Sequence, residues 1–359
     1  MRKPSFVAFP AFLTLFFVLA FGFSGMAQHS EENHHNDTIQ TQNHSDSSIV
    51  EGHSADEGKF NVNEIIIGHV LDDHLWHFTD HLVLPLPIIV YSSERGLEMF
   101  SSSHFYEGHH KVEYNGYKLE GRNIILTATG EKVLDLSITK NVAMLFINAT
   151  ILLLVFLAVA KSYKNNAGKA PKGLQSFIEP IVVFVRDEIV KPNIGHHYQK
   201  YLPYILTLFF FILFGNLLGL LPGSANLTGN IVITATLAVI TFLITNLSGN
   251  KAYWKHIFWT PGVPLPLRII ILPVELIGII TKPFALTIRL FVAITAGHIV
   301  LLSLICMTFI FHSYFVGIGA SLVVLFINLI ELLVAGIQAY VFALFTSLYI
   351  GMATADDHH

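Results

Sequence analysis

Hydrophobic residues gather into five long stretches after position 140, with polar or basic segments between them. The stretches run from Val142 to Ala160, Tyr201 to Leu221, Ile231 to Leu247, Ile269 to Phe311 and Phe315 to Met352. About 20 helical residues, at about 1.5 Å each, cover the ~30 Å hydrocarbon layer of a bilayer. The pattern therefore predicts five membrane-spanning helices. The last two are longer than a perpendicular crossing needs and are expected to tilt or bend.

Basic residues indicate on which side of the membrane the loops lie. The loop between the third and fourth stretches carries Lys251, Lys255 and Arg268. The loop between the first and second is richer still and contains Lys161, Lys164, Lys169, Lys172, Arg186, Lys191 and Lys200. Under the positive-inside rule both loops are cytoplasmic. The chain is therefore expected to enter the membrane from outside and to end in the cytoplasm.

A helical repeat within the first basic loop predicts an amphipathic helix on the membrane surface. Polar residues Gln175, Glu179, Arg186 and Asp187 lie between apolar positions at helical spacing, which are Leu174, Phe177, Ile178, Ile181, Val182, Val185 and Ile189. Further along, the sequence from Pro222 to Asn226 is rich in turn formers. The second and third spans are therefore expected to form an antiparallel hairpin.

The first 59 residues divide into two segments by composition. Residues 1–27 begin with two basic residues, run apolar and end in Gly25-Met26-Ala27, which predicts a signal peptide. A retained first membrane helix is the alternative, and sequencing of the mature N-terminus distinguishes the two. Residues 28–59 are rich in His, Asn, Asp, Ser and Glu, show no metal-ligand spacing, and are expected to be disordered.

Residues 60–140 alternate short hydrophobic runs with turn signals. The stretch Leu84-Pro85-Leu86-Pro87 leads into Ile88-Ile89-Val90-Tyr91, and Asn115-Gly116 lies between two tyrosines. An Asn-Gly pair between strand-forming residues is typical of a tight hairpin. We expect a small extracytoplasmic β-rich module here, followed by a membrane domain at 141–355. Surface positions are expected, in preference to a proton relay, for His69, His74, His77, His81, His109 and His110.

Composition agrees with a membrane protein, since 53% of residues are hydrophobic and 13% charged. The net charge of -4 lacks the basic excess of a nucleic-acid-binding protein. A single cysteine, Cys306, excludes an internal disulfide and is expected to be a small buried side chain. No Walker A sequence, nucleophile or metal-ligand set occurs, so we expect no catalytic residue, cofactor or metal.

Ionisable residues interrupt the last two apolar stretches, where each costs at least ~2.5 kcal/mol and marks an ion path by default. Glu275, Lys282 and Arg289 are spaced by seven and share one helix face, whereas His298 lies nine residues beyond Arg289 and faces elsewhere. In the last stretch Glu331 and Gln338 are also seven apart and share a face, turned toward the preceding helix or a partner.

Arg289 is the most informative of these residues, because a guanidinium remains charged at any accessible pH and needs a carboxylate partner. A static ion pair within the chain, with Glu275 or Glu331, is the structural alternative to a functional role. The flanking sequence favours the functional role.

Residues 283–298 read P-F-A-L-T-I-R-L-F-V-A-I-T-A-G-H. This segment closely resembles the arginine helix of subunit a of the F-type ATP synthase, P-x-x-L-x-x-R-L-F-x-N-x-x-A-G-H or E. Further matches follow in order at Gly173-Leu174-Gln175, Asn216-Leu217-Leu218-Gly219-Leu220-Leu221-Pro222 and Gln338-Ala339-Tyr340-Val341-Phe342, and together they cover about 140–352. One departure is Ala293 in place of the usual asparagine. Either Thr295 or a bound water supplies the hydrogen bonds of that asparagine, or this chain differs functionally there.

The resemblance implies a stator subunit that lies against a ring of c subunits and couples ion flow through two offset half-channels to rotation and ATP synthesis. It implies that Arg289 faces the rotor, that Glu275 serves the cytoplasmic half-channel, and that His298, Glu331 and Gln338 serve the outer one. Lys282, Thr295 and Asn216 are further candidates for channel lining. The implied partners are the c ring, the b-subunit peripheral stalk, other ATP synthase subunits and the lipid of a bacterial inner membrane.

The predicted fold is therefore an all-α polytopic membrane protein with five membrane helices, two of them long and tilted, and a small N-terminal β-rich module. A secondary transporter is the main alternative, but such folds usually show internal repeats and around ten or more spans. A membrane-anchored sensor would leave Arg289 and Glu331 unexplained. The choice between proton and sodium depends on the carboxylate site of the partner ring, and co-purification with an ATPase separates the three classes.

Overall fold

The computed structural model describes residues 72–79, 82–92, 95–107, 110–120, 123–165, 170–221, 223–259, 264–311 and 314–355. The predicted signal peptide and polar segment, His69, His81, His109 and the last four residues lie outside these ranges. The described chain forms two compact units. One comprises residues 141–297 and 327–355, and the other comprises residues 72–140 and 298–326.

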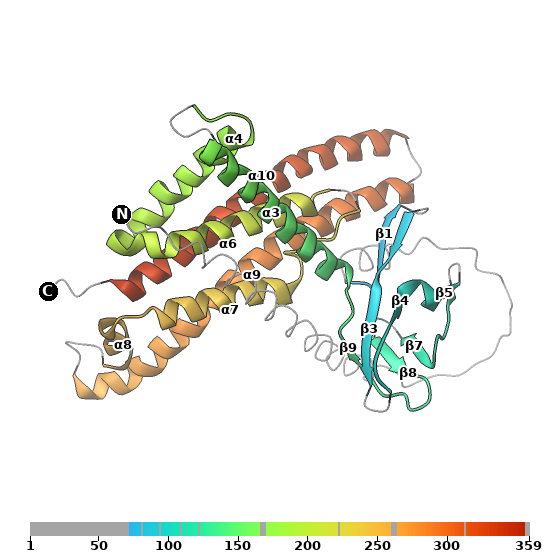
Figure 1. The fold of residues 1–359 in the computed structure, drawn as a ribbon, viewed down its shortest axis with the longest axis horizontal. Coiled ribbons are helices and arrows are strands. Elements are labelled where there is room, and N and C mark those ends of the chain that lie inside the picture. Colours follow the sequence, from blue (N-terminus) through green and yellow to red (C-terminus); the bar gives the residue numbers. More distant parts are fainter. Residues whose placement is uncertain are drawn as a thin grey trace. The chain divides into compact units, whose positions relative to one another are not determined.

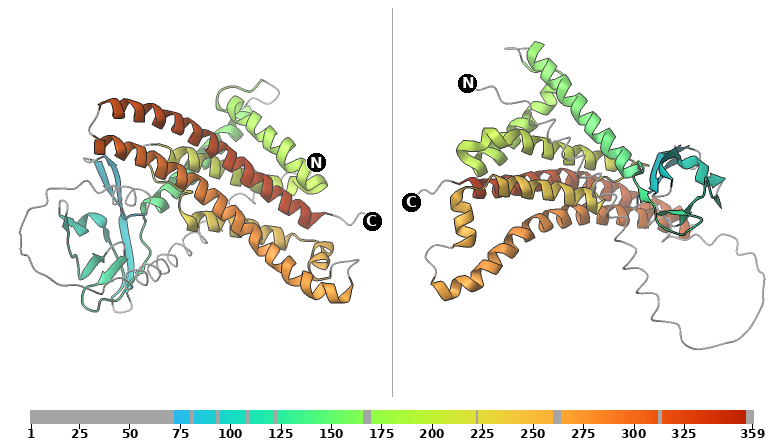
Figure 2. Two further views of the ribbon diagram at one scale, coloured as in Figure 1. Left: turned by 180° about the vertical axis from the view of Figure 1, so that it is seen from behind. Right: turned by 60° about the horizontal axis from the view of Figure 1, so that its bottom comes forward.

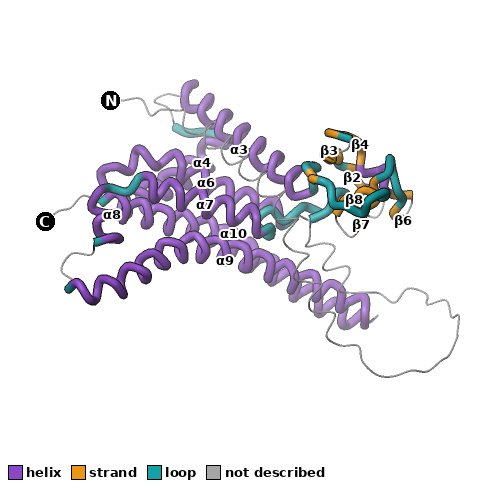
Figure 3. The backbone as a smooth tube through the Cα atoms, turned by 90° about the horizontal axis from the view of Figure 1, so that it is seen from below, coloured by secondary structure: helices purple, strands orange, loops and turns teal. Residues whose placement is uncertain are grey.

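All strands of the described residues lie between positions 75 and 135, ahead of the first long helix (Figure 3). They form four small antiparallel sheets. The strands are β1 (Leu75–Thr79), β2 (Leu82–Pro85), β3 (Pro87–Ser92), β4 (Gly96–Ser101), β5 (Tyr106–Glu107), β6 (His110–Lys111), β7 (Tyr117–Glu120), β8 (Asn123–Leu126) and β9 (Leu134–Asp135), and a short 3₁₀ helix, η1, spans Ser102–Phe105. In the only three-stranded sheet of this described part, β3 lies between β4 and β9.

The predicted Asn-Gly turn is confirmed. Asn115 and Gly116 both have positive φ, 52° and 76°, as a type I′ turn requires. The flanking residues Tyr114 and Tyr117 exchange two backbone hydrogen bonds of 3.0 and 2.9 Å. The local sequence signal was sufficient here because the turn depends on two adjacent residues only.

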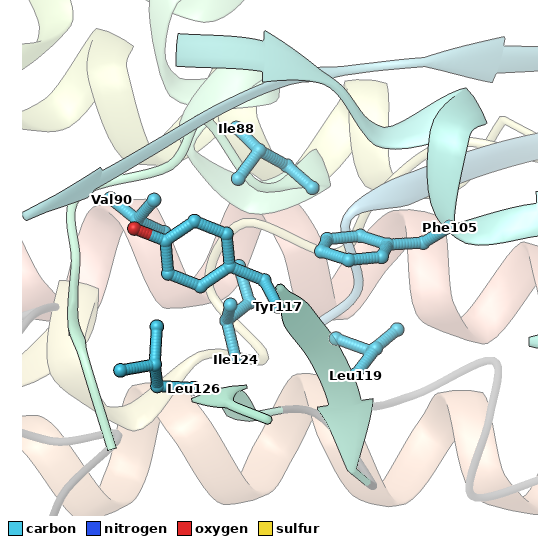
Figure 4. Close-up of a cluster of buried hydrophobic side chains, with 7 residues drawn as sticks. All are labelled: Ile88, Val90, Phe105, Tyr117, Leu119, Ile124 and Leu126. Atoms are coloured by element: carbon cyan, nitrogen blue, oxygen red, sulfur yellow. The ribbon is translucent and has the colours of Figure 1, made fainter. Parts of the chain in front are cut away.

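A small apolar core holds the strands together. Alternate residues of β3, β7 and β8 point inward and are buried, because successive side chains of a strand face opposite sides. Figure 4 shows six of these side chains together with Phe105 of η1, and the cluster consists of Ile88, Val90, Phe105, Tyr117, Leu119, Ile124 and Leu126. Burial of this cluster from several short strands gives the segment a core of its own.

His74 departs from the expectation of a surface histidine. It is 2% exposed, and its Nε2 lies 2.8 Å from Oδ2 of Asp135. Burial lowers the pKa of His74, but the hydrogen bond and charge of Asp135 outweigh burial and raise the pKa above its ordinary value. The same pair holds the pKa of Asp135 below its ordinary value, against the effect of burial. The sequence pattern around His74 could not indicate its burial, because its partner Asp135 lies 61 residues away in the sequence.

From Lys140 onward the described chain is mainly helical (Figure 1). The helices are α3 (Lys140–Asn165), α4 (Leu174–Phe184), the π-helical turn η2 (Val185–Val190), α5 (Lys191–Ile194), the 3₁₀ turn η3 (Gly195–His197), α6 (Tyr198–Gly219), α7 (Ile231–Leu247), α8 (Lys251–Phe258), α9 (Leu265–Phe311) and α10 (Tyr314–Thr354). In the described part, four helical stretches are long and apolar enough to cross a membrane, and α7 makes a fifth if it is taken together with α8, from which it is bent by 102°. The chain is a helical, multi-pass membrane protein.

The expected surface helix differs from its prediction in two ways. Its α-helical part ends at Phe184 and continues as a π-helical turn, whose wider spacing lets Val185, Ile189 and Val190 all be buried. Its polar residue Gln175 is buried and accepts a hydrogen bond from Ser162, whereas Phe177 is exposed. The expected orientation assumed that polar residues face solvent, but a helix next to lipid can bury amides and expose aromatic rings.

Two helix contacts fasten the helical unit. Asn148 of α3 donates through Nδ2 to the carbonyl oxygen of Phe211 in α6, at 3.0 Å. Asn250 donates through its backbone and side-chain nitrogens to the carbonyl oxygens of Ala353 and Thr354, at 2.9 and 3.0 Å, which ties the start of α8 to the end of α10. Both contacts use amide groups because lipid offers no water to backbone carbonyls.

Candidate functional site

Helices α9 and α10 lie side by side and run antiparallel (Figure 2). Three side-chain contacts define how they meet. Glu331 lies against Gly297, the guanidinium of Arg289 lies over the ring of Phe345, and the ammonium of Lys282 lies over the ring of Tyr349. In this order the contact positions fall from 297 to 282 along α9 and rise from 331 to 349 along α10, as antiparallel helices require. Lys282, Arg289 and Glu331 therefore lie where the two helices meet.

Arg289 is exposed, and its Cζ lies 4.5 Å from the centroid of the Phe345 ring. This distance suits a cation–π contact, which stabilises a charge without neutralising it. Within the described residues Arg289 makes no ion pair, so the internal pair with Glu275 or Glu331 considered above is not formed there. The charge remains available to a carboxylate outside the described chain.

Lys282 lies two turns before Arg289 on the same face of α9, and its Nζ is 5.3 Å from the centroid of the Tyr349 ring. Phe345 and Tyr349 are four residues apart, so they are neighbours on α10. Glu275 is close enough to Lys282 to act on it electrostatically. The common face predicted for Lys282 and Arg289 is thus seen in their contacts with one face of α10.

Glu331 is 7% exposed and lies against the backbone of α9 at Gly297. A Cβ placed on Gly297 would collide with Oε1 of Glu331 and would lie 3.1 Å from its Cγ and Cδ. Such distances are too short for ordinary van der Waals contact. A side chain at position 297 would therefore force the Glu331 side chain to move, because the carboxylate occupies the space beside Gly297.

Asn216 connects α6 to α10. Its Nδ2 donates to the carbonyl oxygen of Ala335 at 3.2 Å, and its Oδ1 accepts from the Thr228 hydroxyl at 2.7 Å. The side chain is buried, and α10 approaches closely because Ala335 and Ala339 are small and fully buried. Gln338, on the same helix, is partly buried. Both the nitrogen and the oxygen of the Asn216 amide are therefore hydrogen-bonded within the protein.

Thr295 and His298 complete the predicted set. The Thr295 hydroxyl is buried and has no hydrogen-bond partner within the described residues, so it is available to a water molecule beside Ala293. His298 follows Gly297 directly in α9, but it belongs to the other unit. Its pairing with Glu331 therefore stays a prediction.

Sequence reasoning did not identify Phe345, Tyr349 or Gly297 as parts of the site. Phe345 and Tyr349 lie seven and eleven residues beyond Gln338, so Phe345 continues the heptad that starts at Glu331. Extension of the polar stripe to aromatic residues would have found it. Gly297 was visible as part of a motif, but its role depends on a side chain of another helix.

Comparison with known proteins gives a clear result for the helical part. The model of the family described as ATP synthase A chain matches residues 142–351, more than half of the chain. A second model, described only as a domain of unknown function, matches residues 65–145. The second match falls on the strands of the N-terminal segment.

Several curated relatives are similar over most of the chain. "ATP synthase subunit a" of Chloroherpeton thalassium is 44% identical over 258 residues, which are 70% of this chain and 77% of the relative. The protein of the same description from Chlorobium phaeobacteroides is 45% identical, over 70% of this chain and 75% of its own. "ATP synthase subunit a 2" of Chlorobaculum tepidum is 49% identical over 63% of this chain and 66% of its own.

Proposed function

The chain belongs to the ATP synthase A chain family and is a proton-translocating stator subunit of the F-type membrane sector, and we propose that Arg289 is the fixed charge past which rotor carboxylates move. One observation carries the proposal. Arg289 is exposed on α9, held at the Phe345 ring, with no acid of the described chain in ion-pair contact.

The physical role of Arg289 follows from its permanent charge. An approaching carboxylate is favoured in its ionised form beside a guanidinium, so it releases its proton there. The guanidinium itself, with a pKa above about 12, does not carry the proton across. Arg289 therefore separates two half-channels that would otherwise connect and leak. Each 100 mV of membrane potential supplies about 2.3 kcal/mol per charge, which such a leak would dissipate.

The other candidate residues divide between the two half-channels. Glu275, near Lys282, serves the inner half, while His298, Glu331 and Gln338 serve the outer half. A buried carboxylate at Glu331 beside a histidine forms a pair that can share a proton, since histidine titrates near neutral pH. The close contact of Glu331 with Gly297, the residue before His298, supports this assignment.

The partners and orientation follow from the same assignment. The chain belongs to an ATP synthase complex, and within it we place a ring of c subunits against the exposed face around Arg289 and the b-subunit stalk elsewhere on the helices. The first and third interhelical loops are rich in lysine and arginine, which favours a cytoplasmic position for both. The N-terminal module then lies outside a bacterial inner membrane.

The test uses the complete ATP synthase in vesicles. Arg289→Ala is expected to abolish proton-driven ATP synthesis, and Arg289→Lys is expected to fail as well, because a desolvated ammonium can lose its proton. Assembly is checked by the amount of c ring and stalk that co-purifies. Normal coupled synthesis by Arg289→Lys would overturn the role given to Arg289. Glu275→Gln and Glu331→Gln test the half-channels in the same assay.

A further inference from the structure

A second polar cluster lies beside the arginine helix, between α7, α8, α9 and α10 of the helical unit. The cluster surrounds a crevice of about 10 Å³. Its polar lining residues are Thr241, Thr245, Asn246, Tyr253, Lys282 and Tyr349. A volume of this size holds about one water molecule and nothing larger.

The threonines of α7 differ in one respect that points to a bound molecule. Thr234, Thr236 and Thr241 are buried, and each donates its hydroxyl to a carbonyl oxygen one turn earlier, at 2.8–3.3 Å. Thr245 is also buried, at 5% exposed. Its hydroxyl has no hydrogen-bond partner within the described residues, although it lines the crevice.

A buried hydroxyl without a partner costs about 1–3 kcal/mol, and a bound water removes that cost. Two further groups at the crevice can bond to such a water. The ammonium of Lys282 has three donors, and the Tyr253 hydroxyl, which donates to Oδ1 of Asn246 at 3.2 Å, still has an oxygen that can accept. Three polar partners are the usual number for a buried water.

The charge of the crevice selects water over a cation. Lys282 is one of the lining residues, and its positive charge would repel sodium or another metal ion. The described lining residues include no carboxylate that could offset this repulsion. Water also gives Lys282 a hydrogen-bond partner inside the membrane, where an ionisable side chain otherwise faces a cost. Glu275 is close enough to act electrostatically on both Lys282 and Tyr253.

We propose that this crevice binds one ordered water molecule between the Thr245 hydroxyl and the Lys282 ammonium, and that this water is part of the inner proton path. The second half of the statement rests on the proposed function, which assigns Glu275 to that path. Thr245 acts as a positioning residue: it holds the water and does not itself exchange a proton with the rotor.

The test combines a map of the complete complex with ATP-driven proton pumping in vesicles. Thr245→Val removes the hydroxyl at nearly constant volume, and Thr245→Ser retains it. Thr236→Val is the matched control, because the Thr236 hydroxyl is bonded to its own helix at the Val232 carbonyl. The expected result is water density in the wild type and Thr245→Ser, no density in Thr245→Val, and pumping reduced several-fold only in Thr245→Val.

Two results would overturn the proposal. One is a wild-type map that shows other buried waters but no density in the crevice. The other is Thr245→Val pumping at the rate of Thr236→Val. Glu275→Gln, measured beside them, tests the proposed function separately: normal pumping in Glu275→Gln removes the role of Glu275, whereas the water site is judged by the density and by the Thr245 variants.

Discussion

Glu331 of α10 occupies the space that a side chain at position 297 of α9 would need, so its carboxyl group lies directly against the backbone of Gly297. The two residues are far apart in the sequence: Gly297 is in the segment that resembles the arginine helix, and Glu331 lies seven residues before Gln338. Their contact places a buried acid beside the residue that precedes His298.

Gly297→Ala is expected to displace the Glu331 side chain and to lower proton-driven ATP synthesis. Overpacking of this kind typically costs about 1–3 kcal/mol, which is 5-fold or more in a rate that depends on the geometry. Gly278→Ala is the control on the same helix, because a Cβ there meets nothing within 4 Å. Addition of Glu331→Asp, one methylene shorter, is expected to restore part of the loss. Full activity of Gly297→Ala would contradict the importance of the contact.

Phe345 is expected to hold the Arg289 guanidinium in place through its ring face. Phe345→Leu removes the cation–π contact, worth about 0.5–2 kcal/mol, while it retains an apolar side chain. We expect slower ATP synthesis and a higher proton leak in Phe345→Leu, and near-normal values in Phe345→Tyr, which keeps the ring. Equal rates in the two variants would show that the ring is a packing residue only.

Asn216 and Thr228 are expected to stabilise the protein as a pair. Thr228→Val leaves Oδ1 of the buried Asn216 without its donor, at a cost of about 1–3 kcal/mol. Asn216→Leu also removes the bond to the Ala335 carbonyl and is expected to cost more. Thermal unfolding of the complex in detergent, with a double-mutant cycle, measures the coupling. Additive effects would show that the two side chains act independently.

The His74–Asp135 pair predicts a pH range for the N-terminal segment. Since the pKa of His74 is raised by Asp135, its contribution to stability is complete below about pH 6.5 and is lost as pH rises through the raised value. Since the pKa of Asp135 is lowered, its contribution is complete above about pH 4 and is lost on further acidification. The pair therefore stabilises the segment most between these limits.

Hydrogen exchange of residues 72–79 and 134–140 in the full chain, measured across pH and corrected for intrinsic rates, tests this range. Loss of a buried partner costs about 3–5 kcal/mol, so His74→Ala should speed exchange strongly at mildly acidic pH. His104→Ala is the control, because the His104 side chain is exposed. A pH-independent exchange difference between wild type and His74→Ala would contradict the charge-based explanation.

Helix α8 (Lys251–Phe258) lies where the sequence predicted only a loop. The sequence did predict the long membrane helices of the described part and the Asn115–Gly116 turn. Both depend on residues that are close together along the chain: a run of apolar side chains long enough for a bilayer, and two adjacent residues that tolerate positive φ. Motif resemblance singled out Arg289 and its neighbours, because these residues lie in one short continuous segment.

The packing of the helices determines which residues contact Arg289 and its neighbours. Glu331 meets Gly297, Phe345 meets Arg289, and Asn216 reaches the Ala335 carbonyl across 119 positions. Such contacts depend on how separate helices pack against one another. The spacing of residues within one helix does not predict them. The burial of Gln175 and His74 shows the same limit: a polar residue is buried when a distant partner satisfies it, and lipid outside a helix removes the rule that apolar faces point inward.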